Sequence, residues 1–246
     1  MKADPTDQQR LLDLAAEDLA LTQLTHRRQT LPEVAAVEAA EEAGRQFAAE
    51  VVRTQTDARD LEREVKRLES DVDTVRQRAA RDKQRLDSGG ATPKEMTNLQ
   101  HELQSLARRQ SDLEDQQLEL MERQEAAGAA LAAAQSGHEQ ATADHERAVQ
   151  QRDDALADIA DATGRHEAAR AAAAEGLPAP LLTLYDRIRT QTGTTGAALL
   201  KARQCQGCRI ELNGRELAAV RNAAPDEVVR CDECGRILVR TAESGL

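Results

Sequence analysis

Four cysteines carry the clearest chemistry in this sequence. They form two C-x-x-C pairs, Cys205 with Cys208 and Cys231 with Cys234, and 22 residues separate the pairs. The two-residue spacing lets one tight turn present two sulfur atoms to one ion, so two such pairs supply four thiolates. The pattern predicts a structural, tetrahedral Zn²⁺ site with Cys205, Cys208, Cys231 and Cys234 as the metal ligands. We expect no catalytic residues and no organic cofactor.

Other chemistries use the same residue types. An iron or iron–sulfur site accepts the same four ligands, so the sequence leaves zinc and iron open. Two disulfides are disfavoured because the start of the chain lacks an export signal. A thioredoxin-like redox pair needs a βαβ setting, which is not predicted here. Catalytic zinc is disfavoured because four thiolates leave no coordination position for water.

Short elements are predicted to position the two cysteine pairs. Residues 178–246 are expected to form a linker helix followed by a four-cysteine zinc ribbon. In the helix, at 181–189, the residues on one face are Leu181, Leu184, Tyr185 and Ile188. Predicted strands follow at 197–202, 209–212, 228–230 and 236–240, with a turn and a short helix between 213 and 222. This region has few large apolar residues, so we expect the metal to supply much of its folding free energy.

The first 177 residues have the composition of a long helical structure, dominated by Ala, Glu, Gln, Arg, Asp and Leu. Apolar residues recur at coiled-coil spacing on both sides of Ser88–Pro93. Upstream they are Leu61, Val65, Leu68, Val72, Val75 and Ala79, and downstream Met96, Leu99, Leu103, Leu106, Leu113 and Leu120. We therefore predict a mostly α fold, in which residues 1–177 form a long antiparallel coiled-coil hairpin with its turn at 88–93.

A register test supports the hairpin. Residues paired across two antiparallel helices joined by a short turn have numbers with a constant sum. The sum is 181 for Leu61 with Leu120, Leu68 with Leu113 and Val75 with Leu106, and 182 for Leu86 with Met96. The turn contains two glycines suited to ending a helix, followed by Thr92–Glu95, a capping box with proline at the first helical position.

The hairpin is not predicted to be uniform. Thr30–Glu33 is a second capping-box pattern, so we expect a break near residues 30–32 and helices over 6–29, 32–87 and 93–175. Between 126 and 174 the seam becomes alanine-rich and contains three glycines. Small side chains bury less apolar area, which contributes ~25 cal/mol per Å², so this part should be weaker and more bendable. Disorder is the alternative, which alanine's high helix propensity disfavours.

Composition excludes several classes of protein. The 246 residues include one Phe, one Tyr and no Trp, too few for a large globular core. No apolar run is long enough to predict a membrane span, and Met1–Pro5 does not begin a signal peptide, so we expect a cytoplasmic protein. Residues 1–177 carry 23 basic and 36 acidic residues, a net charge of −13, and residues 178–246 carry 10 and 8, a net of +2. The hairpin is therefore expected to repel nucleic acid.

Four segments together carry a family resemblance. They are Leu31-Pro32; Thr92–Met96 with Leu99–Glu102; Leu113–Asp115 with Leu118–Glu122; and Tyr185–Ile188 followed by the cysteine pairs, ending in Cys234–Leu238. Over nearly its whole length the chain resembles bacterial C4-type zinc-ribbon proteins with a long N-terminal coiled-coil hairpin. The resemblance implies a non-enzymatic adaptor. Because some members are linked to sigma-54 and flagellar gene control, including contact with messenger RNA, it also implies transcription machinery as a candidate partner.

We predict a non-enzymatic adaptor or regulatory protein, whose coiled-coil arm binds a protein and whose zinc ribbon is a docking head. No nucleophile–base pair, phosphate loop or open metal site is visible. The alternative is a regulator that binds RNA or DNA through the ribbon. Its candidate phosphate contacts are Lys201, Arg203, Arg209, Arg215, Arg221, Arg230, Arg236 and Arg240, which equally fit a role in solubility. Near-neutral charge and few aromatics weigh against it. Exposed seam positions could also support a homodimer.

Overall fold

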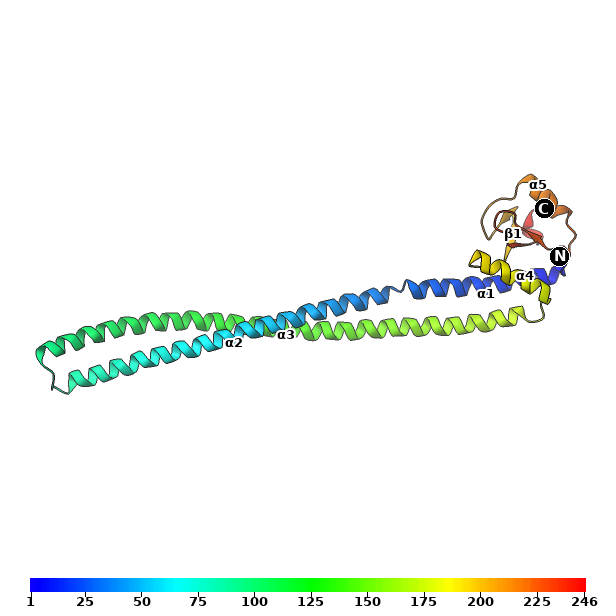
Figure 1. Ribbon diagram of the computed structural model, residues 1–246. Coiled ribbons are helices and arrows are strands. Elements are labelled where there is room, and N and C mark those ends of the chain that lie inside the picture. The colour runs from blue at the N-terminus through cyan, green and yellow to red at the C-terminus, as the bar shows by residue number, and fades with distance from the viewer. The chain divides into compact units, whose positions relative to one another are not determined.

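The computed structural model describes all residues from Met1 to Leu246 (Figure 1). The elements are α1 (Pro5–Gln29), α2 (Pro32–Asp87), α3 (Pro93–Ala174), α4 (Ala179–Thr192), β1 (Ala197–Lys201), β2 (Gln204–Cys205), α5 (Gly214–Asn222), β3 (Val229–Arg230), β4 (Ile237–Val239) and the 3-10 helix η1 (Ala242–Ser244). The chain divides into two compact units: unit 1 contains residues 1–34 and 150–246, and unit 2 contains residues 35–149. None of the helices combines the length and apolar character needed to cross a bilayer.

Unit 2 is a helical hairpin, in which α2 and α3 lie side by side and antiparallel (Figure 1). After α2 ends at Asp87, Gly89 adopts the left-handed conformation, with φ +70°, which glycine reaches without steric cost. The predicted capping box forms at the start of α3. The backbone N–H of Thr92 donates to Glu95 Oε2 at 2.8 Å, and the N–H of Glu95 donates to Thr92 Oγ1 at 3.3 Å.

The seam of unit 2 follows the predicted register. Its buried apolar residues are Val65, Leu68 and Val72 on α2, and Leu106 and Leu113 on α3. Leu68, Val72 and Leu113 form one cluster, against which Val75 and Leu120 pack. Further along α3 the buried seam residues are Ala134, Ala141 and Ala148, which keep the heptad spacing. The coiled coil therefore continues into the alanine-rich segment with smaller side chains.

The seam is more exposed close to the turn. Met96, expected to pair with Leu86, is 40% exposed, whereas Leu86 and Leu99 are half-buried. The two arms leave an open groove of about 550 Å³ beside the turn, lined mainly by polar and charged side chains such as Arg85 and Glu95. These side chains offer little apolar surface whose burial would draw the helix ends together.

Unit 1 packs α1, α4 and the end of α3 against a small sheet. Its main apolar cluster contains Ala3, Leu11, Leu14, Ala15, Leu177, Leu181, Tyr185, Ile188, Ala197, Ile237 and Val239. Leu181, Tyr185 and Ile188 are therefore core residues, as the helical spacing predicted, whereas Leu184 is only partly buried. Residues far apart in the chain share this core.

The break between α1 and α2 lies at Thr30 and Leu31, but the predicted capping box there does not form. Thr30 ends α1 instead, because both its N–H and its hydroxyl donate to the carbonyl of His26 at 3.0 Å. Its backbone has φ −111° and ψ 28°, whereas a residue that caps the start of a helix needs an extended backbone. Glu33 Oε2 consequently has no hydrogen-bond partner.

The sheet of unit 1 has the order β2-β1-β4-β3. β1 pairs antiparallel with β2 and parallel with β4, and β3 pairs antiparallel with β4. The strand predicted at 209–212 is wrong: only Glu211 bridges to Gln204, and the pairing partner of β1 is β2, which was not predicted. The sequence Arg209–Leu212 has apolar residues at alternate positions, as a strand would. Its backbone instead forms hydrogen bonds within the loop around the first cysteine pair.

The packing of unit 1 does not follow the change in composition near residue 177. The N-terminal residues pair with the segment before β3: the N–H of Ala3 donates to the carbonyl of Asp226 at 2.8 Å, and the N–H of Val228 donates to that of Met1 at 3.0 Å. Lys2 forms an ion pair with Asp226 at 2.9 Å. Residues 1–34 and the four-cysteine region therefore belong to one compact unit.

Candidate metal centre

The first cysteine pair follows a tight turn between β1 and β2. Ala202 and Arg203 form this turn with φ values of 46° and 65°. A two-residue hairpin with positive φ at both positions normally uses Asn and Gly, so these residues need outside support. Their N–H groups donate to the carbonyls of Glu243 and Ser244 at 2.8 and 2.9 Å. The C-terminal segment therefore holds the turn that precedes Cys205.

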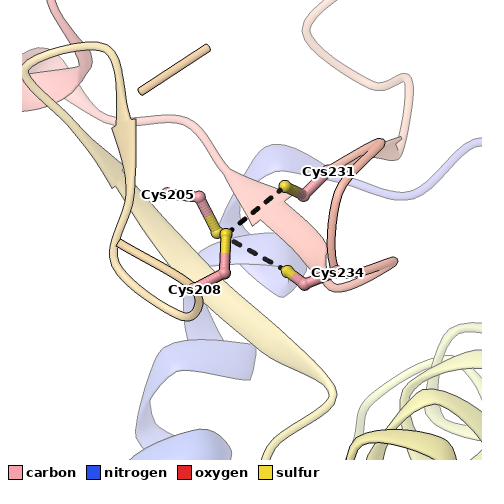
Figure 2. A group of neighbouring side chains, drawn as sticks. All are labelled: Cys205, Cys208, Cys231 and Cys234. Atoms are coloured by element: carbon pink, nitrogen blue, oxygen red, sulfur yellow. Dashed lines mark hydrogen bonds between the residues drawn. The ribbon is translucent and has the colours of Figure 1, made fainter. Parts of the chain in front are cut away.

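The two cysteine pairs have the same backbone geometry. The N–H of Arg209 donates to the carbonyl of Cys205 at 2.7 Å, and the N–H of Gly235 donates to that of Cys231 at 2.8 Å. Arg209 and Gly235 both have left-handed backbones, with φ 61° and 73°. Each loop folds back tightly after its second cysteine and presents both sulfur atoms to the same centre (Figure 2).

Four sulfur atoms converge within 4.8 Å of one another (Figure 2). Cys205 Sγ lies 3.8 Å from Cys234 Sγ, and Cys208 Sγ lies 3.9 Å from Cys231 Sγ. A tetrahedral ion with metal–sulfur distances of about 2.3 Å requires sulfur atoms about 3.8 Å apart. A disulfide requires about 2.05 Å, and all four cysteines are free. The donor atoms and their spacing therefore fit one metal ion, and they do not fit two disulfides.

Burial and hydrogen bonding set the protonation of the thiols. Burial raises the pKa of Cys205, and it raises the pKa of Cys231 to about 12. Burial acts in the same direction on Cys234, but hydrogen bonds from Arg236 and from neighbouring thiols outweigh it and lower the pKa to about 7. Because the thiolate is the metal ligand, metal binding releases protons, and the affinity of this site should fall as the pH falls.

The eight basic residues considered as nucleic-acid contacts are not equivalent. Six of them are exposed: Lys201, Arg203, Arg209, Arg215, Arg221 and Arg230. Arg236 is buried and donates to Thr194 Oγ1 at 2.6 Å. Arg240 donates to five backbone carbonyls between Val220 and Glu227, where α5 ends. Arg236 and Arg240 are therefore engaged inside the domain and poorly placed to contact phosphates.

Unit 1 also contains a charged cluster around the buried carboxylate of Asp18, which the sequence did not predict. Tyr185 Oη donates to Asp18 Oδ2 at 2.6 Å, and Asp18 Oδ1 lies 2.7 Å from Arg170 Nε and 2.8 Å from Arg189 Nε. Arg170 also donates to Asp186 at 2.9 Å. Burial and the hydrogen bond to Asp18 both raise the pKa of Tyr185, so its hydroxyl stays protonated. The cluster fastens α1, α3 and α4 together.

The sequence contains a signal that could have found this cluster. Asp18 lies in the seven-residue gap between Leu14 and Leu21, at a position where the 3,4 spacing of a seam calls for an apolar residue. The structure fully buries Leu14 and Asp18 but only partly buries Leu21. A charged residue on the buried side of a helix requires partners of opposite charge, so this position predicts that arginine or lysine side chains lie next to Asp18.

Comparison with known proteins agrees with both parts of this architecture. Residues 14–193 match the CT398-like coiled coil hairpin domain, and residues 204–238 match the C4-type zinc ribbon domain. An uncharacterized protein of Mycobacterium tuberculosis is 41% identical over 240 residues, and the alignment covers 98% of each chain.

Solved structures also resemble this one. A structure from Mycobacterium smegmatis has a TM-score of 0.78 at 34% identity, with 98% of this chain and 100% of that chain covered. CT398 from Chlamydia trachomatis has a TM-score of 0.59 at 17% identity, with 95% and 97% covered, and it supports the fold alone. The hairpin match spans more than half of the residues, and the second match includes all four cysteines. The chain therefore belongs to the family of proteins with a CT398-like coiled coil hairpin domain, followed here by a C4-type zinc ribbon.

Proposed function

We propose that this protein is a non-enzymatic adaptor, whose helical hairpin binds a protein partner and whose four-cysteine domain is a docking head folded around Zn²⁺. The observation that carries the proposal is an exposed apolar pair on α3. Leu118 is 62% exposed and Met121 is 51% exposed. They are three residues apart and therefore adjacent on the helix surface.

The surroundings of this pair indicate what kind of partner would fit. Glu122 and Glu125 line the same shallow hollow as Leu118 and Met121. Methionine side chains adapt to varied apolar surfaces and are frequent at binding sites. We infer a partner surface that combines apolar side chains with basic ones, because such a surface would bury the pair and match the acidic rim. Components of the transcription machinery are one candidate class.

A matched pair of variants tests the adaptor proposal. The full chain carrying Leu118→Gln and Met121→Gln is compared with one carrying Gln116→Ala and Glu119→Ala, which are exposed on the same helix. Tagged proteins are used to capture partners from native cell extract, with quantification by mass spectrometry. We expect the first variant to lose its specific partner about tenfold and the second to keep it. Capture that is unchanged in both variants, or lost equally in both, contradicts the proposal.

We propose Zn²⁺ rather than iron for the metal. Four cysteine thiolates in a closed tetrahedral arrangement are a common structural zinc site, and zinc needs no redox partner. Elemental analysis of the full chain, purified under reducing conditions, should give about one zinc per chain. Stoichiometric iron in freshly isolated protein would identify the other metal.

A second function, nucleic-acid binding through the ribbon, is favoured by one observation. Arg209 follows the first cysteine pair in a left-handed conformation, where the second pair has Gly235. This conformation costs a residue with a side chain about 1–2 kcal/mol. Arg203 is also left-handed, so two exposed arginines, one on each side of the first cysteine pair in the sequence, have strained backbones. Backbone strain of this kind is concentrated at functional sites.

Salt dependence tests this second function. Binding of the full chain to fluorescent RNA and to duplex DNA is measured by anisotropy at several salt concentrations. Contact with phosphates predicts an affinity that falls as salt rises. The substitutions Arg203→Gln and Arg209→Gln should weaken that dependence, whereas Arg59→Gln and Arg63→Gln, exposed on α2, should not. An absence of salt-dependent binding at low ionic strength rules this function out.

A further inference from the structure

Arg236 lies against both cysteine loops. It comes two residues after Cys234, and it is only 9% exposed. A Cβ atom added at Gly207, in the first loop, would lie 2.6 Å from Arg236 Cδ. The aliphatic part of the arginine therefore covers the first cysteine loop closely, although the residue belongs to the second.

Two threonines hold the polar end of Arg236. Its Nη2 donates to Thr194 Oγ1 at 2.6 Å, and its Nε donates to the carbonyl of Thr195 at 3.1 Å. Its carbonyl accepts from the N–H of Cys231 at 2.9 Å, and its Nε would lie 3.2 Å from a Cβ atom at Gly207, between the cysteines of the first loop. Thr194 and Thr195 form the connection between α4 and β1. One side chain thus links both cysteine loops to the end of α4.

The positive charge of Arg236 can offset the negative charge of a metal site with four thiolates. Four thiolates and one divalent ion carry a net charge of −2, and burial makes that charge costly. The other charged residues of the two loops and the adjoining strand are Arg209, Arg230, Asp232 and Glu233, and all four are exposed. The two acids add negative charge in solvent. Among these charged residues, Arg236 alone is buried.

We propose that Arg236 is a positioning residue of the metal centre. Its buried guanidinium offsets the negative charge of the metal-bound thiolates and anchors both cysteine loops to the turn after α4. This role rests on metal binding as proposed above, and it goes beyond the four ligands. Partners that surround metal ligands in this way typically contribute a 10- to 100-fold effect on metal affinity.

Protons compete with the metal ion for the four thiolates, and this competition sets the direction in which the pH of metal release should move. Without the positive charge, the thiolates become more basic, so protons displace the metal at a higher pH. Up to four protons bind as the metal leaves, so a tenfold loss of affinity moves the pH midpoint of release upward by only about 0.3 unit. Affinity and midpoint should therefore shift together.

Three variants of the full chain test the proposal. Arg236→Met removes the charge, Arg236→Lys retains it, and Arg240→Met removes a second arginine of the same domain that donates only to backbone carbonyls. Zn²⁺ affinity is measured by chelator competition. The pH midpoint of Co²⁺ release is followed by the thiolate–cobalt absorption bands. Thermal unfolding of each variant reports on stability separately.

We expect Arg236→Met to lower Zn²⁺ affinity at least tenfold and to raise the release midpoint, with Arg236→Lys restoring part of both. Arg240→Met should reduce thermal stability and leave both metal readouts unchanged. Equal metal effects in Arg236→Met and Arg240→Met, or no recovery with lysine, overturn the proposal. If Arg236→Met does not fold, Thr194→Val takes its place and should lower Zn²⁺ affinity and raise the release midpoint by smaller amounts. If neither readout changes in Thr194→Val, the proposal is overturned. A wild-type chain that binds no metal refutes the zinc assignment instead.

Discussion

The two compact units of this chain are stabilised in different ways. Unit 2 depends on one seam between two helices, and its buried residues change from Leu and Val to Ala along α3. Unit 1 brings α1, α3, α4 and the sheet together around fully buried large side chains such as Tyr185 and Leu181. It also contains the charged cluster around the buried carboxylate of Asp18 and the four sulfur atoms.

This difference determines how far the destabilisation caused by one substitution should spread through each unit. In unit 2 each seam layer contacts its neighbours along the helices, so the loss of one layer should be felt locally. In unit 1 a single cluster contains Leu11, Tyr185 and Ile237, which are far apart in the chain. Loss of one element there removes contacts from all the others, so unit 1 should open cooperatively.

Metal removal should have the largest effect and should be confined to unit 1. A second core cluster of unit 1 contains Leu200, Leu212 and Leu238 together with Cys205, Cys208, Cys231 and Cys234. Binding of structural zinc contributes on the order of 10 kcal/mol or more to folding in small domains. Cys205→Ser with Cys231→Ser, or a strong chelator, should remove hydrogen-exchange protection from residues 197–241 and lower it in α1 and α4, which share the core of unit 1.

The same exchange experiment provides its own control. Residues 35–149 should keep their protection after metal removal, and adding Zn²⁺ back should restore the wild-type chain but not the serine variant. Protection that persists at 197–241 in metal-free protein would show that the strands fold without the ion. Loss of protection throughout unit 2 would contradict the separation of the two units.

The charged cluster should give the next largest effect. Asp18→Ala leaves two partly exposed guanidinium groups without their shared carboxylate. Breaking a fully buried ion pair costs about 3–5 kcal/mol, and we expect the lower end of that range because water can reach both arginines. Tyr185→Phe removes one hydrogen bond to Asp18 and should cost about 1–3 kcal/mol. Hydrogen exchange in α1 and α4 measures both. Asp13→Ala is the control, because Asp13 is exposed on the same helix; a similar loss with Asp13→Ala would refute the argument.

In unit 2, Leu113→Ala should have a smaller and more local effect. Leu113 is almost completely buried in the Leu68–Val72 cluster, and deletions of this kind cost about 2–5 kcal/mol where the site cannot collapse. Two helices can approach to fill part of the space, so we expect about 2–3 kcal/mol. Exchange should increase around residues 65–75 and 106–120 only. Leu118→Ala, at an exposed position, should change little, and increased exchange in unit 1 would contradict local opening.

The sequence predicted the hairpin well because its information is periodic and local. The seam at Val65, Leu68 and Leu113 follows from heptad spacing, and the turn at Gly89 follows from the conformations that glycine allows. The two cysteine pairs were equally clear, because C-x-x-C spacing alone brings the two sulfur atoms of each pair together. These features need no knowledge of distant contacts.

What the sequence did not predict depends on contacts between distant segments. Nothing local indicates that Met1 and Ala3 pair with residues 226–228, or that Asp18 meets two arginines from α3 and α4. The capping box at Thr30 failed because its hydroxyl and N–H complete the preceding helix. Arg236 and Arg240 looked like surface charges, yet tertiary packing uses both inside the domain.

The smallest predicted effect compares two glycines of α3. A Cβ at Gly128 would meet no atom within 4 Å, whereas one at Gly137 would lie 2.5 Å from the Phe47 ring. Alanine is better than glycine inside a helix by about 1 kcal/mol, so Gly128→Ala should stabilise unit 2 by about 0.5–1 kcal/mol. Gly137→Ala gains the same helix propensity but must displace the ring, so we expect no net gain. Slower local exchange in Gly128→Ala alone would support the close contact between α2 and α3 at Phe47. Equal stabilisation by both substitutions would mean that the ring moves aside freely, and that this part of the seam contributes little specific packing.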